Sequence, residues 1–146
     1  MSEACLSTRR SEDSAPVIEL RTAADAYQLA AIRRVSTSLA AQCDMTLDQL
    51  ADLRLAVDEA CSTLLRIALP DSVIVCTFRV SADSFDFAGC VPTTGAELEG
   101  KYEQTFGWHV LRTLTNELAL DRHPGTGDGR SPTITISFAM RCGESV

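Results

Sequence analysis

The chain has 146 residues, 45% of them hydrophobic and 23% charged, and its mean hydropathy is +0.04. This length is typical of one domain, and the apolar content excludes wholesale disorder. With 13 basic and 20 acidic residues the net charge is −7, which repels phosphates and argues against a nucleic-acid partner. There is no apolar run of the ~18 residues that a membrane-spanning helix needs and no secretory signal, so we expect a cytoplasmic protein with reduced cysteines and no membrane partner.

The N-terminal part of the sequence predicts a tail, a strand and a helix. Residues 1–15 are polar and aperiodic, which indicates a flexible tail. Residues 16–21 alternate weakly and include β-branched side chains, which predicts a first strand. Thr22 is expected to cap a helix over about residues 23–42, where apolar residues recur at spacings of three and four.

The second helix has the clearest sequence pattern. Thr46, followed three residues later by Gln49, resembles a capping box that opens the helix. The apolar residues of this helix keep to one stripe at 100° per residue and stop before Pro70. The stripe consists of Leu50, Leu53, Val57, Cys61, Leu64 and Ala68.

Two alternating, β-branched stretches follow the second helix. They span residues 72–80 and 84–91, and the short link between them predicts a β-hairpin. Residues 92–105 hold one Pro, two Gly and several charges without an apolar stripe, which predicts a long loop. Loops of that length inside compact domains usually act as functional lids.

The C-terminal part of the sequence predicts one more helix and one more strand. The helix is expected from Phe106 to about Leu118. Residues 121–132 are turn-rich, and their glycines at 125–129 indicate a hairpin-like turn rather than a phosphate loop, because no helix follows them. A last strand spans residues 133–139. This order of elements predicts an α/β two-layer sandwich, with helices on one face of a mostly antiparallel sheet.

The second helix also carries a polar stripe, formed by Asp52, Ala56, Glu59 and Thr63. Glu59 and Thr63, spaced i and i+4, would present a carboxylate and a hydroxyl to one cavity, where they would orient a water molecule or a metal-bound phosphate. Spacing alone favours a different interpretation, in which this stripe is the solvated edge of an amphipathic helix. Both interpretations remain open at this point.

The start of the third helix is a second candidate for a functional role. Gly107 lies where backbone amides at a helix N-terminus approach an anion. The alternative is a simple joint between loop and helix, with Trp108 packed on the core. His109 has no Cys or Asp at the spacing of a nucleophile relay, so we expect a packed or exposed histidine rather than a catalytic one.

Residues 51–63, with the sequence ADLRLAVDEACST, resemble the N box of the anti-sigma factor and serine kinase family of the RsbW and SpoIIAB type. The resemblance spans about residues 16–140. It implies the GHKL (Bergerat) ATP-binding fold, as a single domain over residues 16–141 with a C-terminal tail at 142–146. Members of this family usually form homodimers and hold a sigma factor away from RNA polymerase until an anti-anti-sigma protein binds instead. Active members phosphorylate that antagonist on a serine with Mg-ATP.

The resemblance implies roles for four residues. Glu59 falls on the N-box glutamate, the catalytic general base or water-orienting group at the nucleotide. Thr63 takes the place of the asparagine that ligates the magnesium ion, and Gly107 keeps the second glycine of a nucleotide-binding Gly-x-Gly. Arg33 matches an arginine that helps to bind both the sigma factor and the anti-anti-sigma protein.

The sequence also departs from the family pattern at the nucleotide boxes. Thr63 replaces an asparagine, Thr105 replaces the first glycine of the Gly-x-Gly, and residues 88–92 lack the acid that accepts a hydrogen bond from adenine. We therefore expect an anti-sigma factor for an alternative sigma factor of stress or stationary-phase type, with a degenerate pocket that binds Mg-ATP weakly or not at all. The alternatives are an active serine kinase that phosphorylates its antagonist and a domain that serves only as a dimerisation scaffold.

Overall fold

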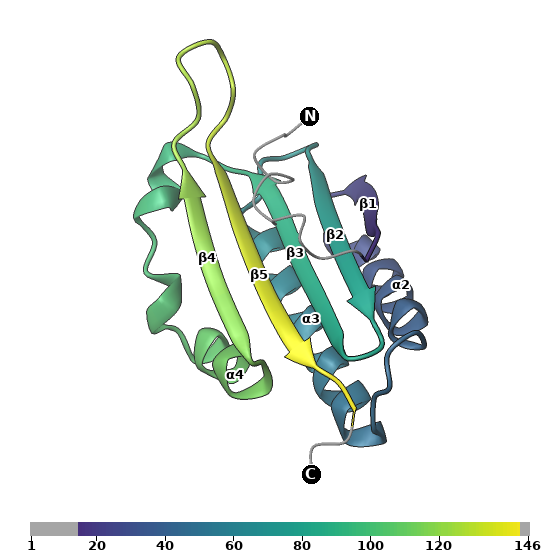
Figure 1. The fold of residues 1–146 in the computed structure, drawn as a ribbon. Coiled ribbons are helices and arrows are strands. Elements are labelled where there is room, and N and C mark those ends of the chain that lie inside the picture. The colour runs from purple at the N-terminus through teal and green to yellow at the C-terminus, as the bar shows by residue number, and fades with distance from the viewer. Residues whose placement is uncertain (1–14, 144–146) are drawn as a thin grey trace.

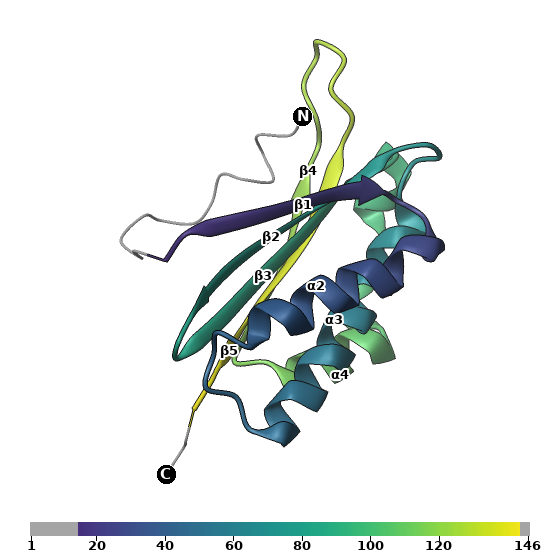
Figure 2. The same cartoon turned by 90° about the vertical axis from the view of Figure 1, so that its right-hand side faces the viewer.

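The computed structural model describes residues 15–143, so the predicted tails, 1–15 and 142–146, lie almost wholly outside the described residues. Five strands form one antiparallel sheet in the order β1-β2-β3-β5-β4. The helices cover one face of this sheet (Figures 1 and 2), which confirms the predicted α/β two-layer sandwich. The elements are β1 (Val17–Ala23), α2 (Leu29–Ala40), α3 (Leu47–Ile67), β2 (Val73–Ser81), β3 (Ser84–Pro92), α4 (Phe106–Leu114), β4 (Glu117–His123) and β5 (Thr133–Arg141).

The predicted cap at Thr22 is wrong. Thr22 lies inside β1 and pairs with Ile74 of β2, so the strand continues to its end at Ala23. Asp25 takes over as the cap, because its Oδ1 accepts a hydrogen bond from the Tyr27 amide at 2.9 Å. A short 3-10 turn, η1 (Ala26–Gln28), follows before α2 begins. Pairing with β2 therefore overrides the local helical pattern at this point.

Helix α3 begins as predicted. The Thr46 hydroxyl accepts a hydrogen bond from the Gln49 amide at 3.0 Å, and the Gln49 side chain accepts one from the Thr46 amide at 2.9 Å. The helix packs against β3 and β5 and buries the middle of its predicted apolar stripe, whereas Leu50 is partly buried and Ala68 lies just beyond the helix end. The core formed in this way includes Leu53, Val57, Cys61 and Leu64 of α3 and the strand residues Phe78, Phe85, Phe87, Ile136 and Phe138.

Strand β4 was not predicted, because its residues were assigned to the third helix and to a connector. Helix α4 ends four residues earlier than predicted, where Thr115 adopts an extended backbone and its hydroxyl donates to the Leu111 carbonyl at 2.8 Å. The following residues pair with β5 along their whole length, and Leu118 and Leu120 turn toward the helix layer. The Gly-rich turn between β4 and β5 is confirmed as a hairpin connection, with Gly125 at φ +86°.

The described residues contain no helix that is long and apolar enough to cross a membrane. Four cysteines of the described residues are free thiols, as expected, and a fifth is not. Cys90 is disulfide-bonded, which contradicts the expectation of a reduced thiol at this residue. The free cysteines of the described part are Cys43, Cys61, Cys76 and Cys142.

Candidate functional site

Glu59 and Gly107, predicted to share a site, do meet in the structure. Glu59 lies in the middle of α3, and Gly107 is the second residue of α4. A Cβ atom added to Gly107 would lie 2.1 Å from Oε2 of Glu59, so any larger residue at 107 would displace the carboxylate. The α4 terminus is fixed by Thr105, whose hydroxyl accepts a hydrogen bond from the Trp108 amide at 3.1 Å.

The polar stripe on α3 is partly buried, and its Glu59 contacts the start of α4. Ala56 is fully buried, and Asp52, Glu59 and Thr63 are each half-buried. The Thr63 hydroxyl donates to the backbone carbonyl of Glu59 at 3.1 Å, one turn back along its own helix. Thr63 therefore lies beside Glu59, as the spacing predicted, with its donor already engaged.

Arg33 lies on α2 and faces α3. Its Nε donates to Oδ1 of Asp58 at 2.8 Å, and the two side chains are 33% and 34% exposed. This hydrogen bond raises the pKa of Arg33 further above its ordinary value. The structure thus brings Glu59 next to Thr63 and Gly107, whereas Arg33 pairs with Asp58. Asp58 was missed by the sequence analysis, because 25 residues separate it from Arg33 and no local pattern links the two.

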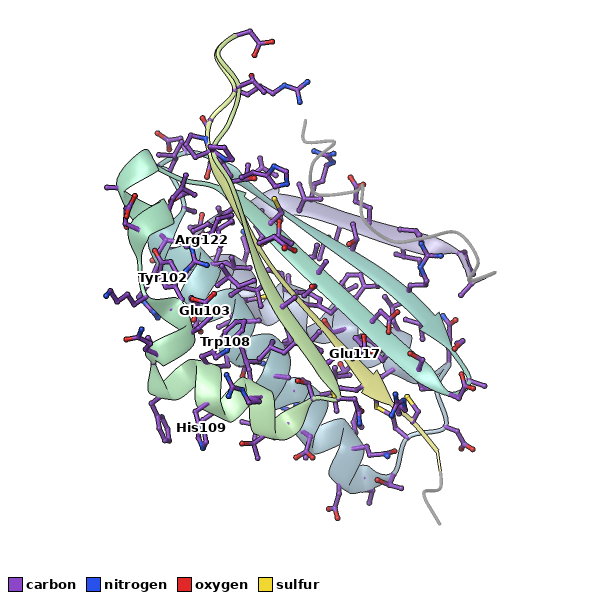
Figure 3. All side chains as sticks on the ribbon, turned by 60° about the vertical axis from the view of Figure 1, so that its left-hand side comes forward. Tyr102, Glu103, Trp108, His109, Glu117 and Arg122 are labelled. Atoms are coloured by element: carbon purple, nitrogen blue, oxygen red, sulfur yellow. The ribbon has the colours of Figure 1, made fainter. Side chains whose placement is uncertain are left out.

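The first turn of α4 also contains Trp108 and His109. Trp108 is 7% exposed and belongs to the core, as the joint interpretation required. His109 is exposed, and Figure 3 shows it on the outer side of α4. The centre of its ring lies 6.5 Å from that of Phe106. The first turn of α4 therefore both anchors the loop to the core through Trp108 and contacts Glu59 through Gly107.

The loop between β3 and α4 forms a second group of contacts that the sequence analysis missed. It contains two 3-10 turns, η2 (Gly95–Glu99) and η3 (Tyr102–Gln104). Arg122 of β4 binds this loop, and Figure 3 shows its side chain close to Tyr102 and Glu103. Its two NH groups donate to the two carboxylate oxygens of Glu103, each at 2.8 Å. No sequence signal marked Arg122, because it lay within the predicted connector.

Burial and hydrogen bonding shift the pKa values of two residues of this loop. Hydrogen bonding to Arg122 lowers the pKa of Glu103 below its ordinary value. Burial, followed by the hydrogen bond to Glu97, raises the pKa of Tyr102 to about 12. At neutral pH the pair of Arg122 and Glu103 is therefore fully charged, and Tyr102 is a neutral hydrogen-bond donor.

The GHKL fold implies a magnesium-bound nucleotide at these residues. Glu59 and Gly107 are in direct contact, so no phosphate fits between them while the carboxylate keeps its position. The Thr63 hydroxyl donates its proton to the Glu59 carbonyl and keeps oxygen lone pairs that can ligate a metal ion. In this conformation the Glu59 carboxylate lies against Gly107, so a nucleotide phosphate at this helix terminus requires the carboxylate to move.

The site thus consists of a glutamate-bearing helix that faces a glycine at the next helix terminus, on one side of an antiparallel sheet. The family model of the histidine kinase-like ATPase domain matches residues 22–131. The anti-sigma-F factor RsbW from two strains of Mycobacterium tuberculosis is 30% identical over 139 residues, which cover 94% of this chain and 77% of that protein. The chain therefore belongs to the RsbW-type family of anti-sigma factors within the histidine kinase-like ATPases.

Proposed function

We propose that this chain is an anti-sigma factor that sequesters an alternative sigma factor in the cytoplasm and releases it when an anti-anti-sigma protein binds. The observation that carries this proposal is the 30% identity to anti-sigma-F factor RsbW, which extends over 94% of the chain. The net charge of −7 supports it, because sigma factors present basic DNA-binding surfaces. An acidic partner associates faster with such a surface and covers it.

Arg33 is the proposed contact residue for both partners. Its guanidinium is anchored to Asp58 and remains one-third exposed, so it is held in one orientation while still open to a partner. Arginine is among the residue types that contribute most to protein interfaces. The family resemblance also supports a homodimer, which we include in the proposal.

We further propose that the nucleotide pocket is degenerate. Loss of a buried adenine acceptor costs ~1–3 kcal/mol, and loss of a metal ligand or a phosphate-binding glycine adds a similar amount. Together these losses shift the affinity for Mg-ATP from the micromolar toward the millimolar range, even if they are not additive. The contact between Glu59 and Gly107 supports this proposal, because a phosphate must first separate the two residues.

The second candidate is an ATP-dependent serine kinase that phosphorylates the anti-anti-sigma antagonist. One observation favours it, namely that Glu59 is retained and lies next to Thr63 and Gly107. A carboxylate in this position has the chemistry of a general base toward a serine hydroxyl.

Titration calorimetry with Mg-ATP, combined with a radiolabel transfer assay to the cognate anti-anti-sigma protein, separates the two candidates. The anti-sigma proposal predicts a millimolar affinity and transfer no greater than that of the Glu59→Ala control. Low-micromolar binding with transfer that Glu59→Ala abolishes would instead establish the kinase.

A further inference from the structure

Arg122 makes an unusually complete set of contacts with the loop of residues 93–105. Besides the two bonds to Glu103, its Nε donates to the Leu98 carbonyl at 3.0 Å and an NH group donates to the Gly100 carbonyl at 2.8 Å. The guanidinium also lies 5.9 Å from the centre of the Tyr102 ring. One side chain therefore holds four residues of the loop against β4, and we refer to this set of contacts as the Arg122 clamp.

The clamp differs from an ordinary surface ion pair. Isolated exposed pairs contribute little to stability, because solvent screens them and holding two long side chains costs entropy. Here the carboxylate is bound bidentately, and the same guanidinium satisfies two backbone carbonyls that have no strand partner. Leu98 and Tyr102 pack on the core beneath the clamp, which fixes the loop from the inner side as well.

The clamped loop is connected directly to the contact between Glu59 and Gly107. Tyr102 accepts hydrogen bonds at its carbonyl from the Thr105 hydroxyl at 2.8 Å and from the Thr105 amide at 3.2 Å. Thr105 is the cap of α4, so its position sets where the first turn of that helix lies. The clamp is thus linked to Gly107 through the backbone from Glu103 to Thr105, the hydrogen bonds between Thr105 and Tyr102, and the first two residues of the helix.

We propose that Arg122 is a positioning residue that keeps the loop of residues 93–105 and the first turn of α4 closed on Glu59, and that this closed arrangement excludes nucleotide. The inference rests on the proposed nucleotide pocket at Glu59 and adds what controls access to it. The proposed weak affinity for Mg-ATP then has two causes. One is the substituted residues of the pocket, and the other is the free energy needed to open the clamp. A protein whose binding-competent state is rarely populated shows a proportionally weaker affinity.

Hydrogen exchange of backbone amides tests the clamp without any nucleotide. Arg122→Gln should accelerate exchange at residues 94–105 about tenfold or more, while α3 and the central strands keep their protection. Arg112→Gln is the matched control, because Arg112 is an exposed arginine of α4 outside the clamp. If Arg122→Gln leaves exchange in the loop unchanged, the clamp is overturned.

A second variant covers the case in which Arg122→Gln loosens the whole domain. Glu103→Gln removes the ionised partner at a side chain that is 39% exposed, so it weakens the clamp with little effect on the core. Faster exchange confined to the loop in this variant supports the clamp. Exchange equal to that of the parent chain overturns it.

Calorimetry with Mg-ATP tests the exclusion of nucleotide. The clamp predicts that Arg122→Gln binds Mg-ATP about tenfold more tightly than the parent chain, whereas mere structural damage would weaken binding. An affinity that is unchanged, or no binding in either protein, overturns the exclusion. Sigma-factor binding measured on the same samples reports separately on the proposed anti-sigma function, since neither Arg122 nor Glu103 is placed in that interface.

Discussion

Arg33 is held in one orientation and remains accessible to a binding partner. Its guanidinium is oriented by Asp58 on the neighbouring helix, and about a third of the side chain stays exposed. An ion pair with this exposure adds little to folding stability. The contribution of Arg33 should therefore be to binding and not to the fold.

Arg33→Ala is expected to weaken sigma-factor binding by ~1–3 kcal/mol, as is typical of an interface arginine, while the melting temperature stays nearly constant. Calorimetric titration of the purified sigma factor into each variant measures the first quantity, and thermal unfolding measures the second. Asp58→Asn, which keeps Arg33 but loosens its orientation, is the control and should give a smaller loss. Unchanged affinity in Arg33→Ala would remove this residue from the interface.

Cys43 has a thiol whose reactivity can be tested, because its surroundings raise its pKa. Burial, together with the Cys142 thiol and nearby carboxylates, raises its pKa to about 12. Only the thiolate reacts with alkylating agents, and free cysteine has a pKa near ~8.5. At pH 7.5 we expect iodoacetamide to modify Cys43 at least ~100-fold more slowly than free cysteine, with the rate rising about tenfold per pH unit up to pH ~10.

Peptide mapping by mass spectrometry after timed alkylation measures the rate at Cys43. The same reaction in denaturant is the control and should proceed as fast as with free cysteine, because unfolding removes the burial. Rapid alkylation of the folded protein at pH 7.5 would contradict the assignment of a raised pKa.

The residues of the candidate site divide according to whether their partners are local. Glu59 and Thr63 lie one turn apart on a single helix, so their spacing alone placed them together. Glu103 and Arg122 are 19 residues apart and belong to a loop and a strand that only the folded sheet brings into contact. Sequence patterns report helix and strand periodicity, and they carry no signal for pairs of this kind.

Among the elements, those with a complete local signal were predicted well. The capping box at Thr46 and the apolar stripe of α3 agree with the structure, as does the hairpin of β2 and β3. Strand β4 was missed, because its Leu-Ala-Leu segment continues the helical pattern of α4 and its charged end resembles a connector. It becomes a strand by pairing with β5, which is a contact between elements and not a property of the segment.

Thr46→Ala tests the contribution of the capping box to α3. The substitution removes the hydroxyl that accepts a hydrogen bond from the Gln49 amide. We expect this loss to lower the free energy of unfolding by ~1 kcal/mol. Urea unfolding followed by circular dichroism measures the change. Thr113→Ala is the matched control, because its hydroxyl only donates back to the His109 carbonyl within α4. That control should be neutral or slightly stabilising, and equal losses in both variants would refute a special role for the cap.

At the scale of the whole molecule, the charge balance is the property that bears most on function. A net charge of −7 creates a field that attracts a basic partner before any contact is made. The sequence alone was sufficient for this inference and for the layer architecture, because both depend on composition and on the order of elements. The sequence predicted a lid-like loop at residues 92–105, but the contacts of that loop with Arg122 and of Gly107 with Glu59 join distant segments and have no local pattern.

The association rate with the sigma factor should therefore fall with ionic strength. We expect at least a tenfold decrease between about 50 and 500 mM salt, while the dissociation rate changes much less. Stopped-flow mixing of the two purified proteins at several salt concentrations measures both rates. An association rate that does not depend on salt would show that the net charge plays no part in recognition.

The central claim is that the chain sequesters a sigma factor and does so with its nucleotide site closed. The most direct test is an equilibrium titration of the purified chain against each purified alternative sigma factor of its organism, with and without Mg-ATP. The account predicts that one sigma factor binds with a Kd below about 1 µM, that Mg-ATP changes this value less than about threefold, and that the anti-anti-sigma protein displaces it. Failure to bind any sigma factor, or binding that requires Mg-ATP, would contradict the account.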